Sequence, residues 1–237
     1  MAEAKQELGR DPRVRAAALV LAAISGWLDG LTFVVLGTVF VSAVTGDLVQ
    51  LGIAIADREW SGLLVLAGAV GSFMAGTVLA VLLANRTGRR AWPGPVHRPL
   101  LVHACVLIVL GTLWTAIGDP QPRSGEAVLV AAVAALAAGV QGGAFLGLGI
   151  RGANVVTVTM VMMLLMAGLT ERVAGVAGPR SDLPLAELAL ILGAYCASGL
   201  IVALALGGKA GVLAWIPAIL GIAVLAIVPF RPATRAA

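Results

Sequence analysis

The chain has 237 residues, of which 60% are hydrophobic and only 12% are charged, and its mean hydropathy is +1.02. Soluble domains carry about 25% charged residues, so this composition excludes an ordinary soluble protein and indicates an integral membrane protein. The length accommodates about six to eight membrane helices of roughly 20 residues each. We therefore expect an all-α integral membrane fold with a single membrane domain over residues 1–237.

The net charge of +4 and the pI near 9.8 do not indicate nucleic-acid binding, because the basic residues flank apolar segments, where they orient a membrane protein. We expect membrane lipid and no nucleic acid among the partners. Cys105 and Cys196 lie in separate apolar segments without a CxxC or Cys/His companion, so neither a disulfide framework nor a metal site is predicted.

The apolar segments, taken in chain order, lie at about 14–36, 39–56, 62–84, 99–118, 127–149, 153–170, 185–206 and 211–230. No small-residue cleavage site follows the start of the first segment, which we therefore expect to be a helix rather than a removable signal peptide. The segments at 39–56 and 153–170 are about 18 residues long, at the short limit for crossing a bilayer. These two segments are therefore the candidates for broken or re-entrant segments.

The distribution of Lys and Arg tests the number of spans, because these residues concentrate on the cytoplasmic side. If all eight segments cross and the N-terminus is cytoplasmic, ten of the 16 basic residues lie inside. If the second and sixth segments enter and return, residues 86–98 and Arg151 move inside, Arg58 and Arg123 move outside, and 13 of the 16 lie inside. We expect six transmembrane helices plus two broken or re-entrant segments, with both termini cytoplasmic; eight spans are the alternative.

The sequence also contains a weak internal repeat. GWLDG at Gly26–Gly30 lies 113 residues before GVQGG at Gly139–Gly143, and after a one-residue insertion Thr45 aligns with Thr159. Repeat one then covers about 14–118 and repeat two about 127–230. Each repeat has three spans, so the second is inverted in the membrane, a construction common in secondary transporters.

Two carboxylates, Asp29 and Asp47, lie within glycine-rich apolar sequence between Ile24 and Ile53. An Asp at the centre of a membrane helix costs roughly 2.5–3.5 kcal/mol on insertion scales, so such a residue is a functional candidate. We expect Asp29 to face the interface between the repeats, near the 139–159 stretch. It is the candidate proton or cation partner, and Asp47 is a second polar contact.

The motifs GWLDG, VFVSAVTGD, GVQGG and NVVTVT resemble those of the YoaK-like bacterial membrane proteins, a family catalogued as a domain of unknown function. The resemblance covers nearly the whole chain and implies a polytopic protein of the bacterial inner membrane, often supposed to be a transporter. The family's Thr-Gly-Asn motif maps to Thr45 and Gly46 with Asp47 in place of Asn. In the second half Gln141 is kept, whereas Gly142 replaces the family's Asn and Met160 follows Thr159 where the family has glycine.

We interpret the polar residues of the two repeats as one site for a small solute or for protons, and we expect a secondary transporter or permease that works by alternating access. The expected site residues are Asp29, Thr45, Gly46, Asp47, Gln141, Asn154, Thr157 and Thr159. The alternative is a purely structural role, in which the Thr, Asn and Gln side chains only join helices by hydrogen bonds. Tyr195 and Ser198, one helical turn apart, are weaker candidates to face the same cluster.

No P-loop, HExxH, nucleophile elbow or dinucleotide fingerprint is present, so we expect no cofactor and no enzymatic activity. Two alternatives stay open: an intramembrane enzyme that uses Asp29 and Asp47 as paired carboxylates, and a non-catalytic membrane scaffold. The sequence does not identify the solute, the coupling ion or the oligomeric state, and a homo-oligomer is compatible with it.

Overall fold

The computed structural model describes residues 9–85, 94–118, 120–146, 152–153, 158–175, 181–207 and 209–228. These form α2 (Pro12–Leu36), α3 (Val44–Ala56), α4 (Trp60–Asn85), α5 (Gly94–Ile117), α6 (Gly125–Leu146), α7 (Val158–Ala174), α8 (Leu185–Ala205), α9 (Ala210–Leu213) and α10 (Ile216–Ile227). No strand occurs in these ranges. The predicted all-α fold is confirmed.

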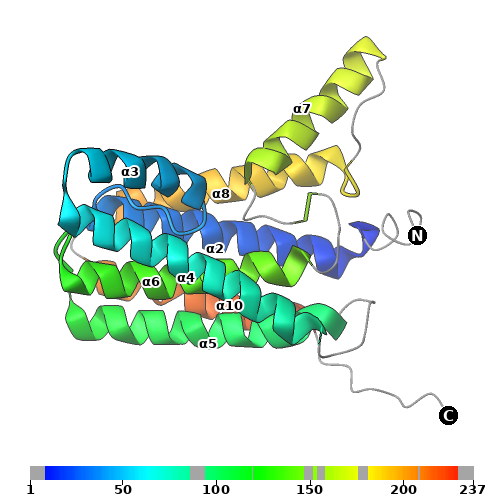
Figure 1. The fold of residues 1–237 in the computed structure, drawn as a ribbon. Coiled ribbons are helices and arrows are strands. Elements are labelled where there is room, and N and C mark those ends of the chain that lie inside the picture. The colour runs from blue at the N-terminus through cyan, green and yellow to red at the C-terminus, as the bar shows by residue number, and fades with distance from the viewer. Residues whose placement is uncertain are drawn as a thin grey trace.

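Six helical stretches in the described residues are long and apolar enough to cross a membrane: α2, α4, α5, α6, α8, and α9 together with α10. They lie side by side in one bundle, whereas α3 covers only part of its length (Figure 1). The predicted number of spans is therefore confirmed, and α3 is a shorter apolar helix. In the sixth predicted segment α7 begins only at Val158, and residues 154–157 lie outside the described part of the chain.

The helices α2 and α8 begin, and α10 ends, at one end of the bundle, which we call the proximal end; α4 ends and α5 begins there as well (Figure 1). The opposite, distal end holds the end of α2, the turn from α3 to α4 and the connection from α5 to α6. The helices α2 and α4 run in opposite directions. The second predicted segment, which lies between them in the sequence, therefore does not cross the bundle. The arrangement agrees with the re-entrant interpretation of that segment.

The start of α5 is earlier than predicted: the helix begins at Gly94, whereas the apolar segment was expected to begin at 99. The prediction treated the proline-rich stretch before Leu100 as a loop. Pro99 instead lies inside the helix. A proline in the first turn of a helix is tolerated because the backbone N–H groups of that turn have no intrahelical acceptor. Pro99 lies just beyond the first turn of α5, where it removes only one backbone hydrogen bond.

Two close helix pairs hold the bundle together. In the pair of α2 with α8, a Cβ placed on Gly26 would lie 2.1 Å from the Tyr195 carbonyl oxygen, and one on Gly30 would lie 3.0 Å from the Gly199 Cα. Since both contacts advance in the same direction along the chain, the two helices run parallel. Only glycine permits such an approach of backbones.

The pair of α4 with α6 repeats this geometry. A Cβ on Gly139 would lie 2.1 Å from the Phe73 carbonyl oxygen, and one on Gly143 would lie 2.7 Å from that of Thr77. Each pair joins the first helix of one predicted repeat to a later helix of the other. The two glycines are separated by four residues in both pairs, as are their partners. These contacts support the inverted repeat, which itself stays a prediction.

Candidate functional site

The chain reverses direction directly after α2. Gly37, with φ of +83°, caps the helix, and Thr38 follows with φ of +71°. Residues 39–43 are not helical and run back beside α2, because Thr32 Oγ1 donates to the Val39 carbonyl oxygen at 2.9 Å. The chain then enters α3 at Val44. We call residues 37–43 the re-entrant segment.

Asp29 fixes this segment from the interior of α2, where its side chain is only 3% exposed. Its Oδ1 accepts hydrogen bonds from the backbone N–H groups of Val41, at 2.8 Å, and Ser42, at 2.7 Å. Its Oδ2 accepts from the Ser42 hydroxyl and from the Tyr195 hydroxyl of α8, both at 2.5 Å. Both carboxylate oxygens therefore have two donors each, and the side chain joins α2, the re-entrant segment and α8.

Asp47 holds the same segment from the first turn of α3, and its side chain is fully buried. Its Oδ1 accepts from the backbone N–H of Phe40 at 3.1 Å, and Gln50 Nε2 lies 3.4 Å from the same oxygen. Its Oδ2 has no hydrogen-bond partner among the described residues. The two carboxylates thus bind the N–H groups of successive residues, Phe40 and Val41, but only Asp29 is fully satisfied.

These bonds explain locally why a non-helical segment is tolerated. Backbone N–H groups that are withdrawn from water and lack helical partners destabilise a membrane protein by several kcal/mol each unless other acceptors replace the helix. Asp29 and Asp47 supply acceptors for three consecutive N–H groups, at residues 40–42. The carboxylates are therefore structural elements of the re-entrant segment as well as candidate binding groups.

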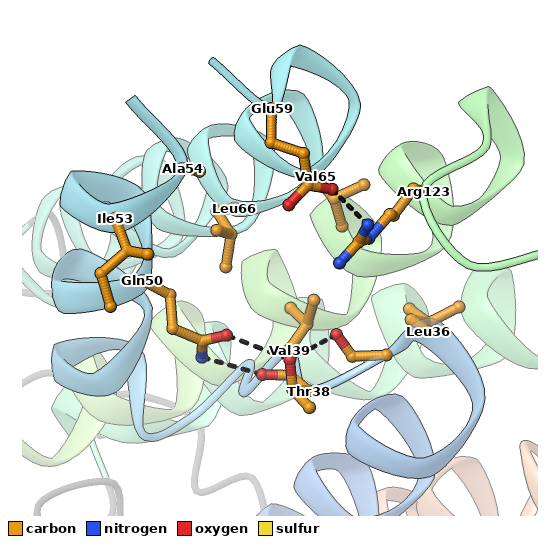
Figure 2. A pocket seen from close by; sticks show the side chains of 12 residues that line it. Leu36, Thr38, Val39, Gln50, Ile53, Ala54, Glu59, Val65, Leu66 and Arg123 are labelled. Carbon is orange, nitrogen blue, oxygen red and sulfur yellow. Dashed lines mark hydrogen bonds and ion pairs between the residues drawn. The ribbon is translucent and has the colours of Figure 1, made fainter. Parts of the chain in front are cut away.

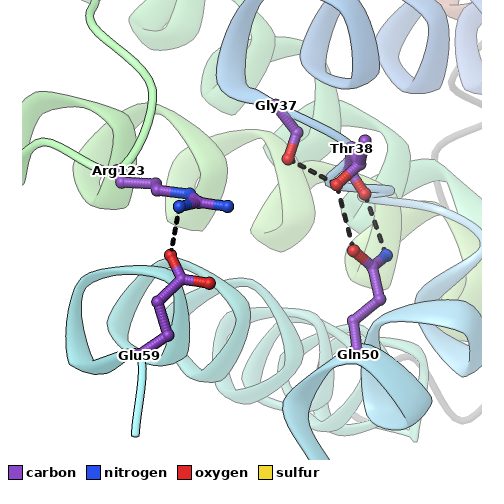
Figure 3. Close-up of polar contacts among 5 residues, drawn as sticks. All are labelled: Gly37, Thr38, Gln50, Glu59 and Arg123. Carbon is purple, nitrogen blue, oxygen red and sulfur yellow. Dashed lines mark hydrogen bonds and ion pairs between the residues drawn. The ribbon is translucent and has the colours of Figure 1, made fainter. Parts of the chain in front are cut away.

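A cavity of about 170 Å³ opens at the distal end, between the start of the re-entrant segment, α3, α4 and the loop before α6 (Figure 2). Its polar lining includes Thr38, Gln50, Glu59 and Arg123. Thr38 and Gln50 bond each other twice, from Thr38 Oγ1 to Gln50 Oε1 at 3.0 Å and from Gln50 Nε2 to the Thr38 carbonyl oxygen at 2.9 Å. Across the cavity Arg123 Nη1 lies 2.5 Å from Glu59 Oε1 (Figure 3).

Backbone strain gathers around this cavity. The non-glycine residues with positive φ in the described chain are Thr38, Arg58 and Arg123, at 71°, 55° and 66°. Two of them line the cavity, and the third precedes Glu59, which also lines it. Non-glycine residues in the left-handed region cost of order 1–3 kcal/mol and cluster at binding and switch sites. The strain marks the distal cavity as a functional candidate.

Two polar residues, Gln141 and His103, join α6 to helices of the first half. Gln141 is buried in α6, and its Nε2 donates to the Leu21 carbonyl oxygen at 3.1 Å and to the Ser25 hydroxyl at 2.9 Å, both on α2. It therefore joins the two halves about one turn of α2 away from Asp29. His103 is also buried, and its Nδ1 lies 2.9 Å from the Ala137 carbonyl oxygen of α6.

The predicted site residues are only partly brought together. Asp29, Gly46 and Asp47 lie at the re-entrant segment or next to it, whereas Thr45 on α3 and Thr159 on α7 are exposed. Asn154 and Thr157 lie outside the described residues. The carboxylate of Asp29 accepts a hydrogen bond from the second half of the sequence, and the donor is Tyr195 rather than a residue of 139–159.

Sequence reasoning gave too little weight to Tyr195 and omitted Ser42. Tyr195 is the only tyrosine of the chain, and an isolated phenol in an apolar helix is a signal that could have raised its rank. Its neighbour Ser198 bonds the Ala194 carbonyl oxygen of its own helix, at 2.6 Å, instead of facing the cluster. Half of the partners of Asp29 are backbone N–H groups, which carry no residue-specific signal at all.

Comparison with known proteins places this arrangement in a family whose function is not known. The family model described as "Protein of unknown function (DUF1275)" matches residues 17–228. The chain is 26% identical over 206 residues to the UPF0700 transmembrane protein YoaK of Bacillus subtilis (strain 168), an alignment that covers 85% of this chain and 88% of that protein. No solved structure matches the chain.

Proposed function

The chain belongs to the DUF1275 family, and from that premise we propose that it is a small-solute secondary transporter or permease. The observation that carries the proposal is the re-entrant segment, a non-helical stretch held inside a membrane bundle by two buried carboxylates. Irregular backbone at membrane depth is tolerated where it is buried in protein or lines a water-filled cavity. Secondary transporters bind their solutes and coupling ions at such interrupted helices.

The proposed mechanism is alternating access by movement of one repeat against the other. The distal cavity is the entrance from one side of the membrane, and Gln50, which lines it, contacts Asp47. The contacts of α2 with α8 and of α4 with α6 join the two repeats. A relative movement at these contacts changes which side of the membrane reaches the carboxylates, and neutralisation of a carboxylate by a proton or a cation favours one of the two arrangements.

We further propose that the proximal end faces the cytoplasm, so that both termini are cytoplasmic. Arg13, Arg15 and Arg98 lie near the starts of α2 and α5, which begin at this end, and the sequence that joins α4 to α5 contains Arg86, Arg89 and Arg90. The distal cavity then opens to the outside of the cell. Basic residues are favoured on the cytoplasmic side of membrane proteins, which supports this orientation.

The proposal is tested with the purified protein reconstituted into vesicles, in which uptake of guanidinium, glycerol and lactate is measured under an imposed pH gradient. These probes are a cation, a neutral solute and an anion of small size. We expect wild-type protein to raise the uptake of at least one probe above that of empty vesicles, and the double variant Asp29→Asn/Asp47→Asn to lose the increase. The matched control is Asp57→Asn, an exposed carboxylate at the end of α3.

Uptake equal to that of empty vesicles for all three probes would count against transport. Uptake that is unchanged in the double variant would show that the carboxylates do not form the site. Chemical conversion of a probe by the wild-type protein, lost in the double variant, would instead favour the intramembrane enzyme.

A further inference from the structure

The two buried carboxylates differ in how many donors they have. Asp29 has two donors on each oxygen, and all four are groups that belong to the protein. Asp47 is fully buried but its Oδ2 has none among the described residues. A buried anionic oxygen without a donor is strongly unfavourable, because it has lost its hydration without any replacement. Asp47 is therefore the carboxylate with one oxygen that lacks a donor.

Gln50 lies between Asp47 and the distal cavity. Its side chain lines the cavity, and its Nε2 donates to the Thr38 carbonyl oxygen at 2.9 Å while lying 3.4 Å from Asp47 Oδ1. The amide is thus a planar, neutral N–H donor placed between a carbonyl and a carboxylate. The longer of its two contacts is the one to the carboxylate, at the outer limit of a hydrogen bond.

The acceptors around Gln50 define the chemistry of a ligand that would replace its amide. Such a ligand meets the carboxylate of Asp47 and the carbonyl of Thr38, the two acceptors that the Gln50 amide contacts. Among the described residues, Arg123 is the basic one that lines the cavity, and it is already paired with Glu59. The balance of charge and of hydrogen-bond acceptors favours a cation with N–H groups, because such a group can donate to several oxygens at once.

We propose that Asp47, with the Thr38 carbonyl oxygen, binds a small organic cation carrying N–H donors, an ammonium or guanidinium group, which enters from the distal cavity and displaces the Gln50 amide. Asp29 is then the positioning residue that holds the re-entrant segment against α2 and α8. This inference deepens the proposed transport function and rests on it for the biological role of the site, but the binding itself requires no transport.

The experiment measures binding to the full-length protein in detergent, from the rise of the melting temperature with guanidinium chloride in the low millimolar range. A ligand that prefers the folded state raises the melting temperature in a saturable way. Sodium chloride and tetramethylammonium chloride at equal ionic strength serve as cations without N–H donors. We expect guanidinium to stabilise the wild type and Asp57→Asn, and the other two salts to have no saturable effect.

Asp47→Asn should raise the Kd for guanidinium at least about tenfold, because the neutral amide cannot accept charge-assisted hydrogen bonds. Gln50→Ala removes the competing amide and should lower the Kd about threefold or more, since the ligand no longer has to displace a group that satisfies the same acceptors. Asp29→Asn should lower the melting temperature without ligand but keep the saturable rise. If Asp47→Asn cannot be obtained folded, the Gln50→Ala measurement decides.

The proposal is overturned if guanidinium does not stabilise the wild type, if Asp47→Asn binds like the wild type, or if Gln50→Ala leaves the Kd unchanged. A saturable effect of sodium alone would assign the site to a metal cation and overturn the N–H donor class. Loss of the effect in Asp29→Asn but not in Asp47→Asn would reverse the two roles. Binding that depends on Asp47, together with uptake no higher than in empty vesicles, would refute transport and leave this site in place.

Discussion

Replacement of Asp29 by Ala separates its structural contribution from its charge. The change leaves four donors without their acceptor: the buried backbone N–H groups of Val41 and Ser42, the buried hydroxyl of Ser42 and the half-buried hydroxyl of Tyr195. The hydroxyls can rotate to other acceptors, whereas the two N–H groups are fixed by the backbone. An unsatisfied buried donor costs about 1–3 kcal/mol, so we expect Asp29→Ala to reduce the free energy of unfolding by about 2–6 kcal/mol.

The matched variant Asp29→Asn should be far milder. Its carbonyl oxygen can accept from both N–H groups, and its NH₂ can donate to Ser42 Oγ and Tyr195 Oη, which then act as acceptors. We expect a loss of about 1 kcal/mol, in the range of single hydrogen-bond changes. For a chain of this size about 2–4 °C of melting temperature corresponds to 1 kcal/mol, so the two variants should differ by about 2–20 °C.

The assay is thermal unfolding of the purified protein in one detergent, followed by circular dichroism, with Tyr195→Phe as a third variant that removes a single donor. Tyr195→Phe should fall between the wild type and Asp29→Ala. The reasoning is refuted if Asp29→Ala and Asp29→Asn melt within about 1 °C of each other, a difference of only about 0.5 kcal/mol, because the bonds to the re-entrant segment would then contribute almost nothing.

Three further outcomes are expected. Single cysteines at Ala91 and Ser124, in a background without the native cysteines, should react from opposite sides of intact cells, Ser124 from outside; external labelling of Ala91 would contradict the re-entrant topology. Gly76→Ala should lower the melting temperature and reduce the free energy of unfolding by about 1–3 kcal/mol through overpacking, because its Cβ would lie 2.3 Å from the Leu136 carbonyl oxygen. The control is Gly71→Ala on the same helix, which should be neutral or stabilising because nothing lies within 4 Å of its Cβ. Arg123→Gln should change the free energy of unfolding by less than about 1 kcal/mol, as partly exposed ion pairs do, yet tighten guanidinium binding; weaker binding would show that Arg123 itself contacts the ligand.

Much of the fold could be predicted from apolar run length and from the placement of Lys and Arg. The six spans correspond to segments long enough to cross a bilayer. The second predicted segment is short, and a topology in which all eight segments cross would put the basic residues of 86–98 outside, whereas basic residues are favoured on the cytoplasmic side. The start of α5 was missed because the basic, proline-rich stretch before Leu100 was treated as a loop. A proline this close to a helix start removes only one backbone hydrogen bond, so the helix can begin before it.

The candidate site was predicted only in part, for a physical reason. A carboxylate in an apolar helix is visible in the sequence because its burial is unfavourable, so Asp29 and Asp47 could be identified. Half of their partners are backbone N–H groups, which every residue except proline carries. The exposed positions of Thr45 and Thr159 could not be predicted either, because a threonine hydroxyl can bond its own helix and so tolerates lipid without any binding role.

The order in which Asp29 meets its partners has a consequence for biosynthesis. Tyr195 follows Asp29 by 166 residues, whereas Val41 and Ser42 follow it by 12 and 13. At a synthesis rate of about 5–20 residues per second, the tyrosine emerges roughly 8–33 s after the aspartate, but the N–H groups emerge within about 3 s. The re-entrant segment can therefore donate hydrogen bonds to Asp29 before α8 has been synthesised. Asp29 can be buried in the membrane without waiting for the second half of the chain.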